Sequence, residues 1–456
     1  MSFTETGHVL ETAIKIVEDV PVCDYCLGRQ YAWLGTGTSN CERGRSVKLT
    51  LLMMADEMMK TGSKKRGEEI IAALAANGRF EPAKQLAKSN GREVSSADAC
   101  HLCAINGESI FDRIESLKGR IEQESKELEF NTFLVGTIPP AKLVERQDEL
   151  NAKYSLMHSE TLKGHFNREL GKALQEMLGR EVDFERPDVV FIYNMNEDRI
   201  DLQVNPVFIY GRYRKLKRGI PQSRWDCSAC KGKGCEECGG TGRRYPDSIS
   251  EYIGNPVQKM LQGTKFKVHA AGREDVDVLM LGDGRPFVVE ISEPRIRTPD
   301  LKKIRKKVNR HARKKIEIDD LAMTSRARLQ ELKEQSSSNI KEYHATIEVE
   351  RKVSDSELRA LEREFNDREI EQRTPERVAH RRSDLVRKKQ VHALRIKREK
   401  KRLLDASLTV QGGTYVKELI SGDDGRTKPS ISSLLGSACK CVKLDVTAIY
   451  GDSSSL

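Results

Sequence analysis

Apolar and polar residues alternate along several segments in the second half of the chain. Clear examples are the segments RPFVVEIS, KQVHALRIK and VKLDVTAIY. Since successive side chains of a β-strand point to opposite faces, this alternation predicts strands with one covered face. We therefore expect residues 246–456 to form a domain with a mixed, mainly antiparallel sheet.

Strand-like and helix-like segments follow one another between residues 126 and 219. FNTFLVGT is typical of a strand, and KGHFNRELGKALQEML has the apolar spacing of an amphipathic helix. PDVVFIYN and RIDLQVNPVFIYG predict two further strands. These segments together predict an α/β module.

The remaining segments have a different composition. Residues 1–125 are expected to be mainly helical, with an apolar helix around Lys48–Lys60. Residues 220–245 are rich in cysteine and glycine and lack apolar periodicity, which is typical of an insert or linker. We thus expect an α+β protein with parts at 1–125, 126–219, 220–245 and 246–456.

The composition favours a cytoplasmic protein. Hydrophobic residues make up 38% of the 456 residues. No apolar run approaches the roughly 20 residues that a membrane-spanning helix needs. The first residues, MSFTETGHVLETAIKIVEDV, are mixed in charge and lack the apolar core of a signal peptide. We therefore expect no contact with a membrane.

The charge distribution suggests a polyanionic partner. Lysine and arginine outnumber aspartate and glutamate by 79 to 69, and the formal net charge is +10. Basic residues gather in two runs, Arg295–Lys315 and Arg377–Arg402. Each run alone is compatible with an exposed helix face or loop, but two such runs favour binding to nucleic acid.

Eight of the eleven cysteines form four CxxC pairs, a spacing that predicts metal binding when no secretory signal is present. Four thiolates satisfy a tetrahedral zinc ion. We expect one or two structural zinc ions, although separate pairs of buried thiols would give the same spacing. The first set is Cys23, Cys26, Cys100 and Cys103, and the second is Cys227, Cys230, Cys235 and Cys238.

The segment AAGREDVDVLMLGDGRPFVVEISEPR, at Ala270–Arg295, resembles the catalytic motif of the Pus-ten family of tRNA pseudouridine synthases. In pseudouridine synthases an aspartate follows an arginine in a short loop that leads into a strand. Arg273 and Asp275 stand at the matching positions. The resemblance therefore implies that Asp275 is the essential carboxylate.

Two later segments resemble the other synthase motifs. In IKEYHATIEVE, Tyr343 matches the tyrosine that lies under the target base. In GGTYVKELISGDDGRTKPSISSLLG, Lys417 matches a basic residue on a strand that pairs with the aspartate. An aliphatic residue that closes the pocket matches Leu434 or the neighbouring Leu435.

Further segments extend the resemblance over nearly the whole chain. EQRTPERVAHRRSD is similar to a basic signature of the family, and CDYCLGRQYAWLG, NTFLVGTIPP and GRYRKLKRGIPQSRWDC resemble its accessory region, which contains a THUMP-type RNA-binding module. One departure is Leu279, which stands where the family pattern has an arginine. A changed affinity or geometry at this position is the expected consequence.

The resemblance implies an isomerase that converts uridine to pseudouridine in the tRNA T-loop, at position 54, at position 55 or at both. This reaction needs no organic cofactor and no group donor. Asp275 would act as nucleophile or as base, and Tyr343 would stack on the flipped uracil. Burial disfavours the ionised form of a carboxyl group, and a nearby cation favours it. The need to keep Asp275 ionised is therefore a physical reason for a lysine at position 417. We expect a monomer whose partner is tRNA.

Two other classes of function compete with this hypothesis. A THUMP-containing methyltransferase or thiouridine synthase needs a glycine-rich loop between a strand and a helix. Gly282-Asp283-Gly284 is the one candidate, and no helix is expected to follow it. A non-catalytic zinc protein that binds RNA is also compatible with the composition.

Overall fold

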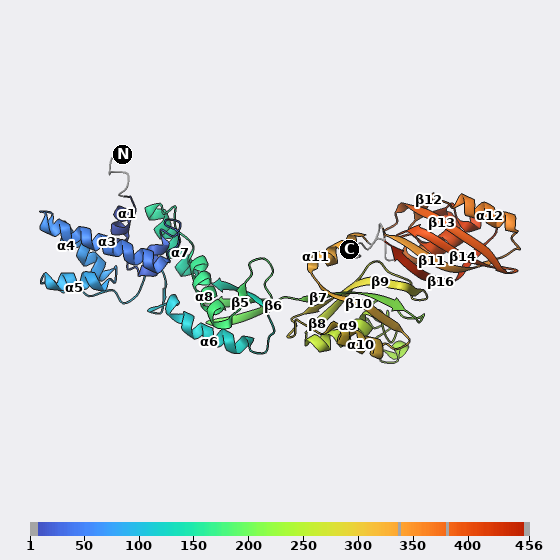
Figure 1. The fold of residues 1–456 in the computed structure, drawn as a ribbon, viewed down its shortest axis with the longest axis horizontal. Coiled ribbons are helices and arrows are strands. Elements are labelled where there is room, and N and C mark those ends of the chain that lie inside the picture. The colour runs from blue at the N-terminus through green and yellow to red at the C-terminus, as the bar shows by residue number, and fades with distance from the viewer. Residues whose placement is uncertain (1–7, 336–338, 380–382, 451–456) are drawn as a thin grey trace. The chain divides into compact units, whose positions relative to one another are not determined.

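The computed structural model describes residues 8–335, 339–379 and 383–450 (Figure 1). The chain divides into two compact units, Met1–Asn205 and Pro206–Leu456. No helix in these described ranges is long and apolar enough to cross a membrane. Each unit has its own hydrophobic core.

The first unit begins with packed helices and continues as an α/β module. Its helices are α1 (His8–Asp19), α2 (Asp24–Arg29), α3 (Asn40–Lys60), α4 (Lys64–Ala76), α5 (Glu81–Ser89), η2 (Ile110–Arg113), α6 (Ile114–Ser125), α7 (Ala141–Tyr154) and α8 (Leu162–Leu178). Its strands are β1 (Ala104–Ile105), β2 (Glu108–Ser109), β3 (Thr132–Ile138), β4 (Glu181–Val182), β5 (Val189–Asn194) and β6 (Arg199–Val204).

Helices α2 and α3 pack backbone to backbone because glycine lies at their contact. A Cβ atom at Gly28 would lie 1.8 Å from the carbonyl oxygen of Asn40, so no larger residue fits there. Ser39 begins α3 by accepting a hydrogen bond from the amide of Glu42, and the Glu42 carboxylate accepts one from the amide of Ser39 in return. The apolar helix expected around Lys48–Lys60 is the second half of α3, which confirms that prediction.

Lys48 joins three segments of this helical region. Its side chain is fully buried, and its Nζ donates hydrogen bonds to the carbonyl oxygens of Val22 and Gly78 at 2.9 and 2.7 Å. The same Nζ lies 2.7 Å from Oδ1 of Asp24, at the start of α2. These three acceptors replace the water molecules that the ammonium loses when it is buried on folding.

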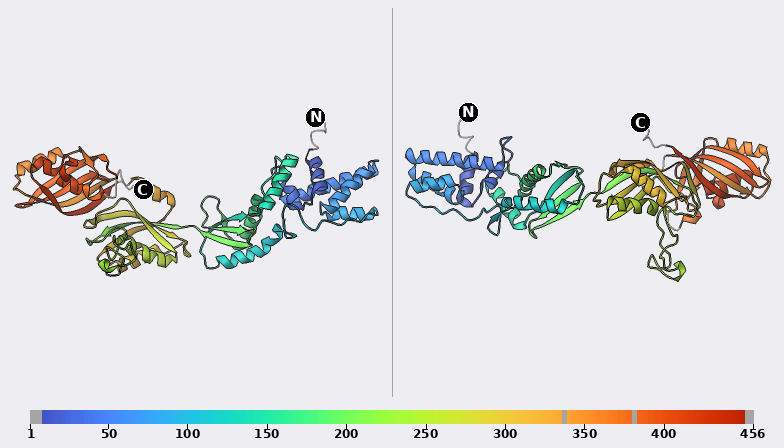
Figure 2. Two further views of the ribbon diagram at one scale, coloured as in Figure 1. Left: turned by 180° about the vertical axis from the view of Figure 1, so that it is seen from behind. Right: turned by 60° about the horizontal axis from the view of Figure 1, so that its bottom comes forward.

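The α/β module of the first unit forms one four-stranded sheet in the order β4-β3-β5-β6. Strand β3 runs parallel to β4 and β5, whereas β6 is antiparallel to β5. Helix α8, predicted from its amphipathic spacing, packs against β3 (Figure 2). Phe166, Leu170 and Leu174 line its buried face.

The second unit is built on a ten-stranded sheet. Nine strands follow the order β10-β7-β9-β16-β11-β14-β13-β12-β15, and β8 pairs with β9. The strands are β7 (Val207–Lys215), β8 (Lys265–Ala270), β9 (Leu279–Ser292), β10 (Ile316–Thr324), β11 (Ile340–Val349), β12 (Arg368–Arg373), β13 (Val386–Lys400), β14 (Leu403–Gln411), β15 (Thr427–Lys428) and β16 (Cys439–Tyr450).

All pairings of this sheet are antiparallel except that of β16 with β9, which confirms the expected mixed, mainly antiparallel sheet. Helices α9 and α10 pack on the β8-to-β10 part, and α12 packs against β13. The helices of the unit are η3 (Glu236–Cys238), α9 (Ile249–Leu261), α10 (Leu301–His311), α11 (Arg326–Gln335), α12 (Asp355–Glu364), α13 (Glu376–Ala379), α14 (Val416–Ser421), η4 (Asp423–Gly425) and α15 (Ile431–Leu435).

Two strand predictions are corrected by the structure. The segment RIDLQVNPVFIYG is not one strand: Asn205 and Pro206 separate β6 in the first unit from β7 in the second. Proline has no amide hydrogen to donate, so the ladder ends there. The segment RPFVVEIS is only the second part of the longer strand β9, which begins at Leu279 and continues through Gly282 and Gly284.

We predict that Lys48→Met lowers the free energy of unfolding of the first unit by about 3 kcal/mol, because it leaves Asp24 and two buried carbonyls without their donor. Urea unfolding of the full-length chain, read through hydrogen exchange of the α3 amides, measures this change. Lys60→Met on the same helix is the matched control, since the Lys60 side chain is 72% exposed and pairs only with Asp56. Equal effects of the two substitutions would contradict the prediction.

Candidate functional site

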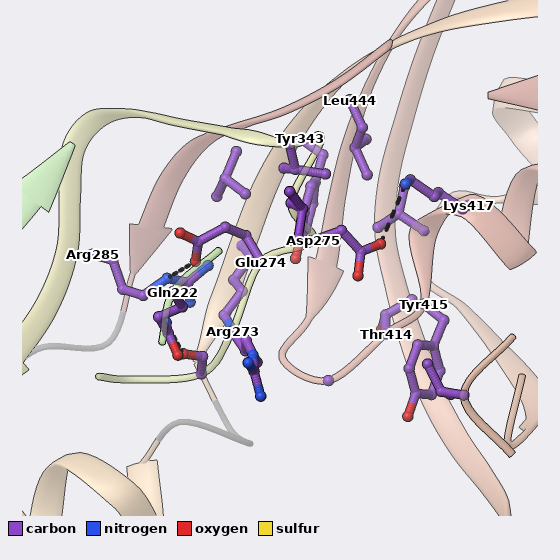
Figure 3. Close-up of a pocket in the computed structure, with 18 of the residues that line it drawn as sticks. Gln222, Arg273, Glu274, Asp275, Arg285, Tyr343, Thr414, Tyr415, Lys417 and Leu444 are labelled. Carbon is purple, nitrogen blue, oxygen red and sulfur yellow. Dashed lines mark hydrogen bonds and ion pairs between the residues drawn. The ribbon is translucent and has the colours of Figure 1, made fainter. Parts of the chain in front are cut away.

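A cavity of about 290 Å³ opens in the second unit beside the loop between β8 and β9 (Figure 3). Residues from this loop, from β11, from β16 and from the segment before and within α14 line the cavity. Five basic side chains and two carboxylates contribute to the lining. These are Arg273, Arg285, Lys341, Arg377 and Lys417, with Glu274 and Asp275.

A buried ion pair holds the loop in place. Oε2 of Glu274 lies 2.9 Å from Nε of Arg285 on β9, and both side chains are 1% exposed. The Tyr213 hydroxyl on β7 donates to the same carboxylate at 2.9 Å. Nη1 of Arg285 donates to the carbonyl oxygen of Ala271 at 2.7 Å, so one guanidinium contacts the start of the loop and its middle residue Glu274.

Lys215, at the end of β7, fixes the backbone of the same loop. Its Nζ donates to the carbonyl oxygens of Asp275 and Val276 at 3.2 and 2.7 Å. Burial lowers the pKa of Lys215 to about 8, although the nearby charge of Glu274 opposes this change. The position of the Asp275 backbone therefore depends on strands β7 and β9 together.

The side chain of Asp275 lies between two cations. Its Oδ1 accepts a hydrogen bond from Nη1 of Arg377 at 3.0 Å, and its Oδ2 lies 3.3 Å from Nζ of Lys417 (Figure 3). Burial lowers the pKa of Lys417, but its hydrogen bond to Asp277 and the charge of Asp275 outweigh burial and raise it. The expected pairing of Lys417 with Asp275 is present in the structure.

Two details of this pairing differ from the expectation. Lys417 lies in helix α14 rather than on a strand, because the chain turns into a helix at Val416. Lys417 is also shared, since its Nζ lies 2.8 Å from Oδ2 of Asp277.

Arg377 is a site residue that sequence analysis did not single out. It appeared only as the first residue of a basic run, yet its guanidinium bridges Asp275 to the buried Glu418 of α14, with an Nε–Oε1 distance of 2.6 Å. The attraction to Glu418 and Asp275 outweighs burial and raises the pKa of Arg377. Arg377 lies within the EQRTPERVAHRRSD segment that resembles a basic signature of the family. Residues 380–382 of that segment lie outside the described residues.

Tyr343 lines the cavity from β11, where it pairs with Leu408 of β14 and Val446 of β16. Burial raises the pKa of its hydroxyl. Leu444 and Val446 from β16 provide the apolar wall beside it (Figure 3).

Leu434 does not join the cavity. It is 42% exposed on α15, and its neighbour Leu435 packs into the core of the unit. Neither residue is among those that line the cavity, and Leu444 of β16 supplies the apolar wall instead. The expectation that Leu434 or Leu435 closes the pocket is therefore corrected.

Arg273 lies at the edge of the cavity and is exposed. Its Nη2 donates to Oγ of Ser223 at 3.0 Å, and its guanidinium lies 6.0 Å from the ring centroid of Trp225. Leu279 begins β9, where it is aligned with Asp445 of β16 and is not among the residues that line the cavity. The departure from the family pattern at Leu279 therefore lies outside the described cavity lining.

Lys341 is a second cavity residue that the sequence did not single out. It lies two positions before Tyr343 on β11, and side chains two apart on a strand share a face. The whole residue is 5% exposed. Burial, followed by the positive charge of Arg285, lowers the pKa of Lys341 to about 7.

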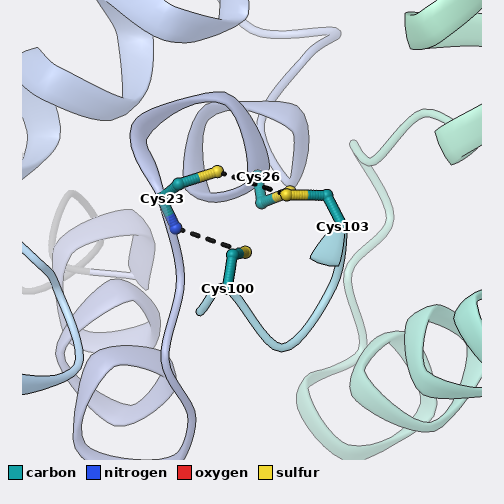
Figure 4. A group of neighbouring side chains, drawn as sticks. All are labelled: Cys23, Cys26, Cys100 and Cys103. Carbon is teal, nitrogen blue, oxygen red and sulfur yellow. Dashed lines mark hydrogen bonds between the residues drawn. The ribbon is translucent and has the colours of Figure 1, made fainter. Parts of the chain in front are cut away.

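The predicted cysteine sets each come together in space, and Figure 4 shows the first set. Within each set, the sulfur atoms lie within 4.8 Å of one another. In the second set, amides of Gly234 and Gly242 donate to the sulfurs of Cys230 and Cys238 at 3.2 and 3.1 Å. Such donors favour the thiolate form, so either set could hold a metal ion through four sulfur ligands.

Sequence comparison identifies relatives over the full chain. Residues 208–450 match the family model described as Pus10, C-terminal, and residues 118–194 match that described as Pus10 THUMP domain, archaeal. The tRNA pseudouridine synthase Pus10 of Methanothrix thermoacetophila is 39% identical, over 98% of this chain and 95% of the relative. The protein of the same name from Methanocaldococcus jannaschii is 40% identical, over 98% of this chain and 96% of the relative.

Similarity to solved structures is weak. A chain in the crystal structure of a Cbf5-Nop10-Gar1 complex is 20% identical over 42% of this chain and 43% of that chain, with a TM-score of 0.26. The full-length matches in sequence are far stronger, and from them we conclude that the chain belongs to the Pus10 family of tRNA pseudouridine synthases.

Proposed function

We propose that this chain isomerises uridine to pseudouridine at positions 54 and 55 of the tRNA T-loop, with Asp275 as the essential carboxylate. The observation that carries the proposal is the position of Asp275 between Arg377 and Lys417, in a cavity that Tyr343 also lines. The choice of the T-loop rests on the resemblance to the family.

The reaction breaks the N1–C1′ bond of the nucleotide, turns the uracil ring and forms a C5–C1′ bond. Asp275 acts on the ribose, as nucleophile at C1′ or as base at C2′. Both roles need an ionised carboxylate, and the two cations that contact its oxygens favour this form. Arg377 and Lys417 also hold the carboxylate in one orientation.

The cavity suits a single base taken out of the RNA stack. Tyr343 provides a ring against which the uracil stacks, and Leu444 and Val446 exclude water from one side. The polar edge of the base then faces the basic side chains of the cavity. A tyrosine and an aliphatic wall bind the flat faces of the base, while the charged groups act on its polar atoms.

We also propose an RNA-binding surface, formed by basic residues outside the cavity. Helix α10 buries Ile304 and Val308 and presents a series of lysines and arginines on its other face. Phosphate contacts of this kind position the tRNA without reading its sequence. The first unit, with its THUMP match, contributes a second RNA-binding element.

We further propose that the two cysteine sets hold one structural zinc ion each. Each set offers four thiolates and no open position, which is typical of structural rather than catalytic zinc. The second set lies beyond a short stem, in which the backbones of Asp226 and Arg243 form an antiparallel β-bridge. The neighbouring Trp225 lines the cavity. The ion there stabilises the insert beside the site.

We predict that Asp275→Asn abolishes pseudouridine formation, lowering the rate by roughly a thousandfold or more, while tRNA affinity stays close to wild type. The measurement is carbodiimide mapping of pseudouridine by reverse transcription on an unmodified tRNA transcript without cofactor, together with filter binding. Asp277→Asn is the informative comparison, because Asp277 also contacts Lys417 but does not line the cavity. We expect it to cost less than about tenfold.

Two outcomes would refute this proposal: no reverse-transcription stop in the T-loop with wild-type protein, or unchanged stops with Asp275→Asn.

We predict that purified protein contains close to two zinc ions per chain. Cys230→Ala should lower the content to one, since a structural site that loses a thiolate ligand binds zinc far more weakly. Cys441→Ala is the control, because Cys441 belongs to neither set and should leave the content at two. Mass-spectrometric metal analysis decides between these values, and one ion per wild-type chain would exclude a second site.

A further inference from the structure

Lys341 places a buried amine in the cavity without a partner from the protein. It is 5% exposed and lines the same cavity as Asp275. Within residues 8–335, 339–379 and 383–450, its Nζ makes no hydrogen bond and no ion pair. A buried ammonium without an acceptor is unfavourable, so its presence calls for an explanation.

The surroundings of Lys341 increase this cost. Arg285 and Lys389 are cationic neighbours, and Nζ of Lys389 donates a hydrogen bond to the carbonyl oxygen of Gly412. Glu274 acts in the opposite direction, but Arg285 and Tyr213 already occupy its oxygens. No carboxylate of the described chain is therefore available to neutralise Lys341.

The fold keeps space in front of this amine. Gly272 has a φ of +84°, and a Cβ atom there would lie 3.0 Å from Nζ of Lys341 and 3.1 Å from Nη1 of Arg285. A glycine at this position leaves the front of the amine open. The space belongs to the cavity, so a ligand that enters the cavity reaches Lys341.

The position on β11 indicates which part of a nucleotide would meet the amine. Lys341 shares the face of the strand with Tyr343, on which the base would stack. Phosphates remain with the RNA backbone, where exposed cations such as Arg273 can meet them. A nearly buried amine beside the stacking tyrosine faces the base instead.

We propose that Lys341 is a catalytic residue, whose ammonium donates a hydrogen bond to a carbonyl oxygen of the flipped uracil and stabilises the negative charge that develops on the ring. The inference rests on the proposed pseudouridine synthase activity. When the N1–C1′ bond breaks, its electron pair stays on uracil and spreads over N1 and the carbonyl oxygens. A ring electron pair at C5 then forms the C5–C1′ bond, C5 gives its proton to water, and N1 takes one proton from water, so that the number of protons is unchanged. Lys341 keeps its proton throughout.

This role accounts for the missing partner. A protein carboxylate at this place would compete with the developing charge, whereas an ammonium held ready needs no rearrangement during the reaction. The neighbouring Arg285 adds to the positive potential. The unfavourable burial of the Lys341 ammonium is thus relieved when negative charge forms on the uracil. An interaction that is stronger in the transition state than in the ground state lowers the activation barrier.

The test compares Lys341→Met with Lys388→Met in the full-length protein. Lys388 lies on the same sheet, pairs with Glu369 at 2.9 Å and is 66% exposed, so its loss removes one charge away from the cavity. We expect Lys341→Met to lower the single-turnover rate about a hundredfold and to change the tRNA Kd by less than about threefold. Lys388→Met should stay within about twofold of wild type in both. Lys341→Gln, which keeps a neutral donor, should fall between them.

Thermal unfolding separates this role from a structural one. Since Lys341 is buried without a partner, Lys341→Met should raise the unfolding midpoint, whereas loss of a structural residue lowers it. The pKa of Lys341 is lowered from 10.5 to about 7 in the folded state, so its destabilising effect is complete below about pH 7 and disappears as the pH rises toward 10.5. The gain from Lys341→Met should therefore be larger at low pH than at high pH.

A substrate containing 5-fluorouridine provides a chemical readout. Fluorine stabilises a negatively charged uracil ring, so the loss of Lys341 should matter less for release of this base. We expect the rate defect of Lys341→Met to shrink at least about tenfold on the fluorinated tRNA. A defect of equal size on both substrates would overturn the proposed role.

The remaining outcomes are equally distinct. Wild-type activity in Lys341→Met would overturn this inference alone. A loss confined to the tRNA Kd would assign Lys341 to a phosphate and would also overturn it. Absence of pseudouridine with wild-type protein would instead overturn the proposed function, and this inference with it.

Discussion

The buried ion pair between Glu274 and Arg285 is the constraint on which the candidate site depends. It connects the loop before β9 to β9 itself, and Tyr213 brings β7 into the same contact. Asp275 is the next residue after Glu274, so its backbone is fixed with the loop, and its side chain is then held by Arg377 and Lys417. A loop of this length would otherwise be mobile, and a carboxylate that acts on a ribose has to be held within a fraction of an ångström.

The cations that face Asp275 come from later parts of the chain. Arg377 belongs to α13 and Lys417 to α14, and the buried Glu418 beside Lys417 orients Arg377. The carboxylate is therefore supplied by one end of the sheet and its partners by two helices that follow the central strands. The site forms only when the pairing of β9, β16 and β11 has brought these segments together. Folding and assembly of the site are for this reason a single process.

Local sequence was sufficient for features that depend on local spacing. The alternation in KQVHALRIK and VKLDVTAIY predicted β13 and β16, the spacing in KGHFNRELGKALQEML predicted α8, and the CxxC pairs predicted both cysteine sets. The resemblance to a family was needed for Asp275, Tyr343 and Lys417, whose side chains taken singly have ordinary structural explanations. Their joint position around one cavity is a property of the fold.

The features that sequence analysis missed depend on contacts between distant segments. Leu434 and Leu444 are both leucines in apolar surroundings, and only the position of β16 beside β11 brings Leu444 to the cavity. Arg377 was one of many basic residues in its run, and nothing local distinguishes the one that reaches Asp275. Lys341 is polar at a buried position of β11, but its lack of a partner becomes visible only when every neighbouring strand is in place.

The retention of charge in this interior is itself informative. Replacing a buried ion pair with apolar residues of similar size is often neutral or stabilising, so Glu274 and Arg285 are not explained by stability alone. Glu274 pairs with Arg285 and fixes the loop. The positive charge of Arg285 still acts on the neighbouring Lys341 and Tyr343. An apolar pair could match this stability, but it would remove the hydrogen bonds to Tyr213 and Ala271 and the charge of Arg285. The cavity therefore combines a rigid anion at Asp275 with a positive interior, which is the arrangement required when one bond to ribose breaks and the departing base carries the negative charge.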